Sequence, residues 1–169
     1  IFVVENNGYG LSTPSNEQFR CRSIADKGIG YGIEGQSIDG NNVLKVYETI
    51  SQLAVNIRER PRPVLLECVT FRMRGHEEAS GTKYVPKELF EIWGKKDPVS
   101  RFEDFLLAEG VLTEDMIRET KATIKQEIEA GLEIAFGEKL PAPDTESELA
   151  DVYKPFVLQE TDPSEKTKN

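Results

Sequence analysis

The stretch Val64-Leu65-Leu66-Glu67-Cys68-Val69-Thr70-Phe71 is the strongest candidate β-strand in the chain. It is apolar over most of its length and contains β-branched residues, which is typical of a strand buried in a parallel sheet. A shorter run of the same kind, Ile1-Phe2-Val3-Val4, ends at Glu5-Asn6-Asn7-Gly8. We therefore expect a second strand at residues 1–4, buried on both of its faces.

Between these two runs the sequence becomes helical from Asn41, and Pro61 ends the helix. Its apolar side chains recur every three or four residues, as they do on the buried face of a helix. They are Val43, Val46, Tyr47, Ile50, Leu53, Ala54 and Ile57. Strand, helix and strand in this order predict a crossover between parallel strands, and therefore an α/β fold with a parallel sheet flanked by helices. Two smaller elements are also expected: a short helix at residues 22–27 that Gly28 ends, and an extended piece at residues 35–40.

The second half of the chain predicts a helical C-terminal extension. Pro86 can begin a short helix, and Asp97-Pro98 is an N-cap with proline at the first helical position. Thr113 caps a longer helix with one apolar stripe, and from Asp144 the composition becomes acidic and turn-rich. Residues 159–169 contain no apolar side chain, which is typical of a solvated tail or linker. We expect three segments: residues 1–95, a helical extension at 96–143, and an acidic polar tail or linker at 144–169.

The composition excludes several classes of function. The 169 residues carry 30 Asp and Glu against 21 Lys and Arg, a net charge of −9. Such a surface repels phosphate backbones and anionic lipid, so we expect neither nucleic acid nor membrane as a partner. Cys21 and Cys68 have no metal-ligand spacing and are expected to be plain thiols in a reducing compartment. Because the chain opens on the apolar run at Ile1, without Met or a basic region, we expect position 1 to lie inside a larger polypeptide.

Asn6-Asn7-Gly8-Tyr9 is the first candidate site. Asn-Gly is the commonest two-residue hairpin turn, but residues 10–16 offer only turn formers in place of a second strand. The alternative is a loop at the carboxyl end of a parallel strand, where open α/β sheets bind ligands. Amide and carbonyl oxygens there suit a hard cation such as Mg²⁺.

Gly30-Tyr31-Gly32-Ile33-Glu34-Gly35 matches the dinucleotide fingerprint in its glycine spacing. That fingerprint requires a strand before it and a helix after it, whereas here a short helix precedes and an extended piece follows. Nucleotide binding at this segment is therefore disfavoured.

Phe71-Arg72-Met73-Arg74-Gly75-His76-Glu77-Glu78 follows the strongest strand and should share its sheet edge with Asn7. Strand alternation places Arg72 and Arg74 on one face, where two guanidinium groups could bind a diphosphate. His76 is the only histidine. A single histidine is most often a surface residue, but its neighbours here also fit a catalytic role. The adjacent glutamates fit a solvated charged loop.

These motifs resemble a known family. Val3-Val4-Glu5-Asn6-Asn7-Gly8-Tyr9-Gly10, with Ser12 and Thr13, is similar to the second half of the thiamine-diphosphate motif. Phe71-Arg72-Met73-Arg74-Gly75-His76 with Tyr84, followed by Lys96-Asp97-Pro98, resembles the α subunit of 2-oxo acid dehydrogenases of the branched-chain oxo acid, pyruvate or acetoin type. The resemblance runs from Ile1 to about Phe156 and rests on three separate motifs in family order.

The resemblance implies a thiamine-diphosphate-binding fold and a set of site residues. The Asn7 side chain and the Tyr9 backbone carbonyl would be Mg²⁺ ligands, and Arg72 would contact the diphosphate. Tyr84 would belong to a loop, residues 75–85, that becomes ordered on cofactor binding. His76 would be the active-site histidine, acting in decarboxylation or in acyl transfer to lipoamide. Residues 1–95 would then be the C-terminal half of the diphosphate-binding domain.

The resemblance also implies the reaction and the assembly. The enzyme would oxidatively decarboxylate a 2-oxo acid such as 2-oxoisovalerate or pyruvate. It would pair with a β-type subunit or domain, as α2β2 or as a fused dimer, and serve a lipoyl-bearing acyltransferase. The bacterial cytoplasm or the mitochondrial matrix would be its compartment. The Gly-Asp-Gly half of the motif does not occur in this chain, so the isolated chain would be inactive.

A further departure from the family pattern and two alternatives qualify this interpretation. Glu77 stands where many relatives have serine, which makes phosphorylation there doubtful, and Ser80 is a weak substitute. One alternative is a non-catalytic assembly module, although an interface has no need of two arginines at a strand end. The other is a transketolase-like enzyme, which would share Asn6-Asn7 but not Arg72-Met73-Arg74-Gly75-His76 or Lys96-Asp97-Pro98.

Overall fold

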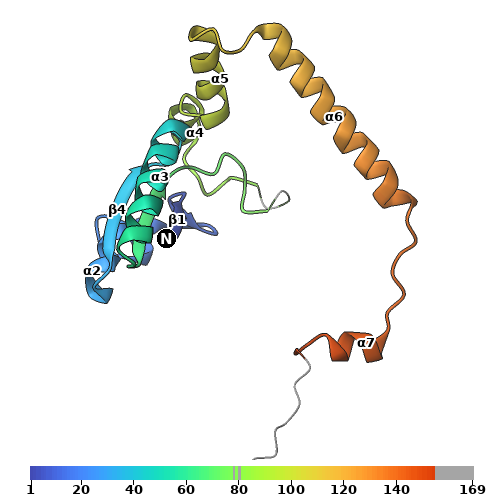
Figure 1. Cartoon of the computed structure of the whole chain (residues 1–169), viewed down its shortest axis with the longest axis horizontal. Coiled ribbons are helices and arrows are strands. Elements are labelled where there is room, and N and C mark those ends of the chain that lie inside the picture. Colours follow the sequence, from blue (N-terminus) through green and yellow to red (C-terminus); the bar gives the residue numbers. More distant parts are fainter. Residues whose placement is uncertain (78, 80, 155–169) are drawn as a thin grey trace, which may run out of the picture. The chain divides into compact units, whose positions relative to one another are not determined.

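The computed structural model describes residues 1–77, 79 and 81–154. The chain forms two compact units, Ile1–Ile117 and Arg118–Asn169 (Figure 1). The first unit holds the sheet and all of the predicted site residues. In the described residues, no helix combines the length and the apolar character that crossing a bilayer requires.

The first unit is built on a three-stranded parallel sheet in the order β1-β5-β4. The strands are β1 (Phe2–Asn6), β4 (Glu34–Asp39) and β5 (Val64–Val69). Helix α3 (Val43–Glu59) is the crossover from β4 to β5, with the Asn42 side chain accepting a hydrogen bond from the Lys45 amide at its N-terminus. The predicted α/β fold with a parallel sheet flanked by helices is confirmed.

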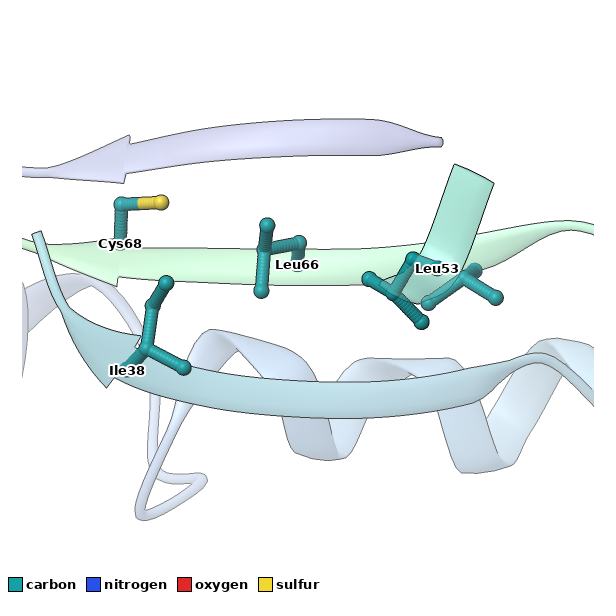
Figure 2. Close-up of a cluster of buried hydrophobic side chains, with 5 residues drawn as sticks. Ile38, Leu53, Leu66 and Cys68 are labelled. Atoms are coloured by element: carbon teal, nitrogen blue, oxygen red, sulfur yellow. The ribbon is translucent and has the colours of Figure 1, made fainter. Parts of the chain in front are cut away.

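The core lies between the sheet and α3. Val64, Leu66 and Cys68 alternate along β5 and face this core, where Leu53 of α3 and Ile38 of β4 meet them (Figure 2). Val46, Ile50 and Ile57 of the predicted helical face pack against the same cluster. Tyr47, in contrast, is 73% exposed, so the buried face of α3 is narrower than its apolar pattern predicts.

The prediction that the first strand is buried on both faces is wrong for the described residues. Phe2 is 60% exposed and Val3 is 52% exposed. The reason is position: β1 is an edge strand that pairs only with β5, and the side chains of α3 reach β5 and β4. An apolar run indicates a strand, but its burial depends on what lies above and below it.

On the opposite face of the sheet, the 3₁₀ helix η1 (Ile24–Lys27) lies against β4 and β5, and the short helix α2 (Gly28–Tyr31) follows it. η1 ends at Lys27 with Gly28 as its C-cap, as predicted, and the Gly28 amide bonds to the Ala25 and Asp26 carbonyls. The backbone stays helical at Gly28, where α2 begins, and Gly32 caps α2 with φ of +65°. A Cβ at Gly35 would collide with the Ala25 carbonyl oxygen, so glycine lets η1 lie directly on β4.

Helices α4 (Lys87–Gly94) and α5 (Pro98–Ala108) follow β5 and confirm the predicted helices after Pro86 and Asp97. At the start of α5, the Asp97 carboxylate accepts a 2.8 Å hydrogen bond from the Ser100 amide. Just beyond its end, Gly110 has φ of +66°. The pKa of Asp97 lies below its usual value, chiefly because its carboxylate accepts this backbone hydrogen bond.

Helix α6 (Glu114–Gly137) begins as predicted, where the Thr113 hydroxyl accepts a hydrogen bond from the Met116 amide. Of its apolar stripe only Ile117 is buried, whereas Ile124, Ile128 and Leu132 are about half-exposed. Residues 145–150, predicted as a turn-rich tail, form helix α7 (Thr145–Ala150). Its cap is local: the Asp144 carboxylate accepts hydrogen bonds from two backbone amides. Phe156 and the polar stretch 159–169 lie outside the described residues.

Candidate functional site

Two polar loops leave the sheet side by side at its carboxyl edge. Asn6 at the end of β1 pairs in register with Val69 at the end of β5, and the Thr70 amide donates a 2.9 Å hydrogen bond to the Asn6 carbonyl. Parallel pairing therefore brings Asn7 and the Arg72 loop to one edge, as the sequence predicts.

The loop after β1 is held by two local hydrogen bonds. The Asn6 side-chain oxygen accepts one from the Gly8 amide at 3.1 Å, and the Asn7 side-chain oxygen accepts one from the Tyr9 amide at 3.0 Å. Gly8 has φ of +83°, a backbone conformation that residues with a side chain rarely adopt. The Asn7 side-chain oxygen keeps a second lone pair available to a ligand.

Asn7-Gly8 is not a turn between β1 and a hairpin partner, since β1 pairs in parallel with β5. A small hairpin does form two residues later, where β2 (Tyr9–Gly10) pairs antiparallel with β3 (Thr13–Pro14). The expectation that residues 10–16 supply only turn formers is therefore wrong. The turn at its tip is possible because Leu11 adopts φ of +56°. A short helix, α1 (Ser15–Gln18), follows β3.

Glu67 lies beneath this loop in the middle of β5 and is 1% exposed. One carboxylate oxygen accepts a 2.7 Å hydrogen bond from the Asn6 side-chain amide. The other accepts hydrogen bonds from the Ser23 hydroxyl and, at 3.4 Å, from the Ala25 amide at the start of η1. Burial raises the pKa of Glu67, but these bonds and one from the Ile24 amide outweigh it and leave the pKa below its usual value. Glu67 is therefore a buried anion.

Sequence reasoning missed the role of Glu67, although a signal was present. Glu67 is the single charged residue in an otherwise apolar predicted strand. A charged side chain at such a position is seldom buried unless hydrogen bonds or a counter-ion satisfy it. The groups that donate hydrogen bonds to Glu67 come from segments 42 to 61 residues away in the sequence.

The predicted arrangement of the two arginines is not observed. Strand β5 ends at Val69, so Arg72 and Arg74 lie on a loop and strand alternation does not place them on one face. Arg72 is half-buried, whereas Arg74 and His76 are exposed. Among residues 1–77, 79 and 81–154, no hydrogen bond, ion pair or ring contact joins Arg72 or His76 to Asn7 or Tyr9. Glu78 and Ser80 lie outside the described residues.

Thr70 and Phe71, the first residues after β5, are held by residues outside the loop that follows β1. The Phe71 ring stacks on Trp93 of α4 at 5.6 Å between ring centroids and meets Phe90 edge-on at 5.4 Å. The Thr70 hydroxyl bonds to the side chain of Asn41, which also donates to the Lys96 carbonyl. The Lys96-Asp97-Pro98 segment is thus tied to the base of the loop that carries Arg72.

Tyr84 lies against the loop after β1. Its ring meets the Tyr9 ring edge-on, with 5.8 Å between centroids and 64° between the planes. The next residue, Val85, is buried, and its amide bonds to the Thr82 carbonyl. The C-terminal end of the 75–85 loop is therefore anchored beside Asn7 and Tyr9.

An open cleft of about 320 Å³ lies beside the loop after β1, the end of β5 and helix α4. Asn7 and Tyr9 line one side, and Thr70, Phe71 and Trp93 line another. The described residues contain no group of three or more His, Cys, Asp and Glu side chains that could hold a metal ion. The cleft offers amide and carbonyl oxygens instead, which suit a hard cation that keeps some of its waters and binds phosphate oxygens.

Two other sequence features lie outside the cleft. The segment 30–35 runs from the end of α2 into the start of β4, the reverse of the strand-to-helix order of a dinucleotide fingerprint. Both cysteines are free thiols. Burial raises the pKa of Cys68, and the charges of Glu5 and Glu67 raise it further, so the thiol stays protonated at neutral pH.

Comparison with known proteins gives a consistent result. Residues 1–144 match the family described as dehydrogenase E1 component. The chain is 34% identical over 154 residues to the alpha subunit of acetoin:2,6-dichlorophenolindophenol oxidoreductase from Bacillus subtilis, covering 90% of this chain and 45% of that protein. It is 33% identical over 162 residues to the human mitochondrial 2-oxoisovalerate dehydrogenase subunit alpha, covering 94% of this chain and 36% of that protein.

A third relative is the pyruvate dehydrogenase E1 component subunit alpha of Rickettsia bellii, 28% identical over 153 residues, covering 90% of this chain and 46% of that protein. The chain thus spans less than half the length of these relatives. All three are alpha subunits, and the family match covers the sheet and the cleft. The chain therefore belongs to the dehydrogenase E1 component family, as an alpha-type 2-oxo acid dehydrogenase component.

Proposed function

We propose that this chain holds the diphosphate end of thiamine diphosphate in an enzyme that oxidatively decarboxylates a 2-oxo acid and passes the acyl group to lipoamide. Family membership implies thiamine diphosphate. The observation that carries the proposal is the meeting of the Asn7 loop and the Arg72 loop at one sheet edge, beside an open cleft.

The Asn7 side-chain oxygen and the Tyr9 backbone carbonyl are the proposed Mg²⁺ ligands. The donor chemistry fits, because both are neutral oxygens and Mg²⁺ completes its octahedral shell with water and phosphate oxygens. The bond from the Tyr9 amide to Asn7 holds the asparagine in place and uses only one lone pair of its oxygen. The loop is therefore shaped for a cation before one binds.

Arg72 is the proposed diphosphate contact. Its guanidinium makes no ion pair within the part of the chain that the structure describes, so a bound phosphate would not have to compete with a carboxylate. The chemistry of a guanidinium fits two phosphate oxygens at once. Phe71, which packs against two aromatic rings of α4, fixes the backbone from which Arg72 extends.

His76 is the proposed catalytic residue, and its exposure leaves it accessible to a substrate. The bound cofactor supplies the electron sink for loss of carbon dioxide, so the protein has to bind, orient and move protons. An imidazole suits proton transfer near neutral pH, and we assign His76 to a proton at the reacting acyl group. Tyr84, anchored on Tyr9, would hold one end of the loop that covers the diphosphate.

The assembly belongs to the proposal as well. We infer a β-type subunit or domain, in an α2β2 or fused dimer, that supplies the other side of the site. A lipoyl-bearing acyltransferase would take the acyl group, in the bacterial cytoplasm or the mitochondrial matrix. Branched-chain oxo acids and pyruvate are the candidate substrates for this decarboxylation, whereas acetoin, which has no carboxyl group, would be cleaved between its two oxygen-bearing carbons; the isolated chain would be inactive. The segments 1–95, 96–143 and 144–169 remain the proposed domain organisation.

The test is calorimetric titration of the complete protein, purified with its partner subunit, with thiamine diphosphate in the presence and absence of Mg²⁺. We expect binding that requires Mg²⁺ and that Asn7→Ala weakens more than 10-fold, in line with the loss of a metal ligand. A matched control is Asn56→Ala on the exposed side of α3, which should bind normally. Wild-type protein that does not bind the cofactor, or binds it equally well without Mg²⁺, would contradict the proposal.

A further inference from the structure

Glu67 is a charged group that the proposed chemistry does not use. It is 1% exposed and faces away from the core cluster of Val64, Leu66 and Cys68 on the same strand, toward η1. A side chain so deeply buried cannot contact a bound cofactor. Burying an anion is costly, and its hydrogen bonds offset that cost. The question is what those hydrogen bonds achieve.

The two carboxylate oxygens face two different segments. One oxygen accepts from the Asn6 side-chain amide at 2.7 Å, and the other accepts from the Ser23 hydroxyl and the Ala25 backbone amide. Because the first oxygen can only accept, the NH₂ group of Asn6 must point at it. The opposite end of the Asn6 amide, its oxygen, then faces the Gly8 amide and accepts from it at 3.1 Å. Glu67 thereby determines which way round the Asn6 amide lies.

We propose that Glu67 is a positioning residue that orients the Asn6 side chain and, through it, shapes the loop that presents the Asn7 and Tyr9 oxygens to Mg²⁺. This inference rests on the proposed function. Both ends of the Asn6 side chain are used by Glu67 and the Gly8 amide, and Gly8 lies between the two proposed ligand residues in the chain. Metal sites commonly depend on such groups, which hold the ligands without touching the metal.

The substitution Glu67→Gln tests whether the Asn6 side chain must donate and residue 67 accept in the hydrogen bond between them. It leaves the volume of side chain 67 almost unchanged. The backbone amides of Ile24 and Ala25 can only donate, so they require the oxygen of the new amide. The NH₂ group of Gln must then face Asn6, whose own amide has to turn over to accept from it. The turned Asn6 presents an NH₂ group to the Gly8 amide, and two donors then oppose each other where a hydrogen bond was.

A second substitution restores the lost polarity. In Glu67→Gln combined with Asn6→Asp, one carboxylate oxygen of the aspartate can accept from the glutamine and the other from the Gly8 amide. The negative charge has moved from one partner to the other, and every donor again faces an acceptor. Asn6→Asp alone places two carboxylates against each other and is expected to be the most damaging of the three.

The experiment measures the Mg²⁺ dependence of thiamine diphosphate binding by calorimetry, together with the melting temperature, on the complete protein purified with its partner subunit. We expect Glu67→Gln to raise the Mg²⁺ concentration for half-saturation about 10-fold, and the double variant to return it to within about 3-fold of wild type. Ser23→Ala, which removes a hydrogen bond from the other carboxylate oxygen, is the control: it should lower the melting temperature and leave the Mg²⁺ dependence unchanged.

Each outcome decides the matter. Unchanged Mg²⁺ dependence in a folded Glu67→Gln variant overturns the inference and leaves the proposed function intact. An equal effect of Ser23→Ala, or unfolding of both Glu67→Gln and the double variant, shows that Glu67 stabilises the core only. If Glu67→Gln fails to fold while the double variant folds and binds, the link between residues 6 and 67 is supported. Wild-type protein that binds no cofactor overturns the proposed function and this inference with it.

Discussion

The hydroxyl of Thr70 donates a 2.6 Å hydrogen bond to the side-chain oxygen of Asn41. Asn41 is 5% exposed, and its side-chain amide donates in turn to the Lys96 carbonyl at 2.9 Å. Gly40, just before it, donates its amide to the Val69 carbonyl at the end of β5. One asparagine therefore connects the end of β5, the turn after β4 and the segment before α5.

Asn41→Ala should lower the free energy of unfolding by about 1–3 kcal/mol, because it removes a buried side chain and takes the hydrogen-bond partner from the Thr70 hydroxyl and the Lys96 carbonyl in a partly buried site. Urea denaturation followed by circular dichroism measures this. Lys45→Ala, at an exposed position on α3, serves as control and should change stability by no more than about 0.5 kcal/mol. Equal effects of the two substitutions would show that the buried asparagine contributes nothing specific.

Gly35→Ala should be strongly destabilising, because a Cβ there would collide with the Ala25 carbonyl oxygen and push η1 away from the sheet. Gly30→Ala is the matched control, since a Cβ at Gly30 has no neighbour within 4 Å and the position lies in helix α2. It should be neutral or stabilise by up to about 1 kcal/mol. Thermal unfolding of the two variants side by side is the measurement, and a stable Gly35→Ala protein would contradict the close packing.

The pH dependence of stability should carry a contribution from Glu67. Its pKa is lowered in the folded protein, since its hydrogen bonds outweigh the effect of burial. The stability that it contributes is therefore present above the unfolded-state pKa of about 4.3, and it is lost as the pH falls through the lower, folded-state pKa. The difference in unfolding free energy between wild type and Glu67→Gln should shrink below about pH 4. A difference that stays constant from pH 7 to pH 3 would contradict this.

Substitutions of His76 and Arg72 should have opposite kinetic effects in the complete enzyme. His76→Ala should lower turnover at least about 100-fold while cofactor affinity stays within a few-fold, as expected for a lost acid–base group. Arg72→Ala should weaken cofactor binding, and excess thiamine diphosphate should partly restore the rate. Steady-state kinetics at varied cofactor concentration separates the two patterns. Near-normal turnover of His76→Ala in both decarboxylation and acyl transfer would mean that this histidine is only a surface residue.

The contact between Tyr9 and Tyr84 should protect the neighbouring Lys83 from trypsin. Tyr9→Leu removes the aromatic partner and leaves the backbone carbonyl of residue 9 in place, so cleavage after Lys83 should become faster. Tyr9→Phe keeps the ring and should be cleaved like wild type. Thiamine diphosphate with Mg²⁺ should slow cleavage in all three proteins. Mass spectrometry of timed digests gives the rates, and identical rates for the Leu and Phe variants would argue against the ring contact as an anchor.

Features that depend on near neighbours in the chain could be predicted from the sequence. The cap at Asp97 and the proline at the start of α5 both involve residues within one helical turn of each other. The parallel sheet followed from the strand, helix and strand order, because a crossover of this length joins strands that run the same way. Parallel pairing in turn placed Asn7 and Arg72 at one sheet edge.

Features that depend on contacts between distant residues were predicted incorrectly or not at all. Gly28 caps η1, but the second helix that follows it directly, α2, was not predicted. Strand alternation predicts Arg72 and Arg74 on one face, but β5 ends at Val69, before it reaches either arginine. The Tyr84 ring found its partner in Tyr9, which no local pattern indicates.

The sequence by itself determined the α/β architecture, the starts of the longer helices and the residue types of the candidate site, because hydrophobic periodicity, capping and turn preference act over a few residues. Only the tertiary structure decided the burial of each strand and the partners of each polar group. Glu67 and Asn6 are 61 residues apart in the chain, yet the Asn6 side-chain nitrogen lies 2.7 Å from a Glu67 carboxylate oxygen. A buried carboxylate must find donors wherever the fold provides them, and that choice is made when the strands pair.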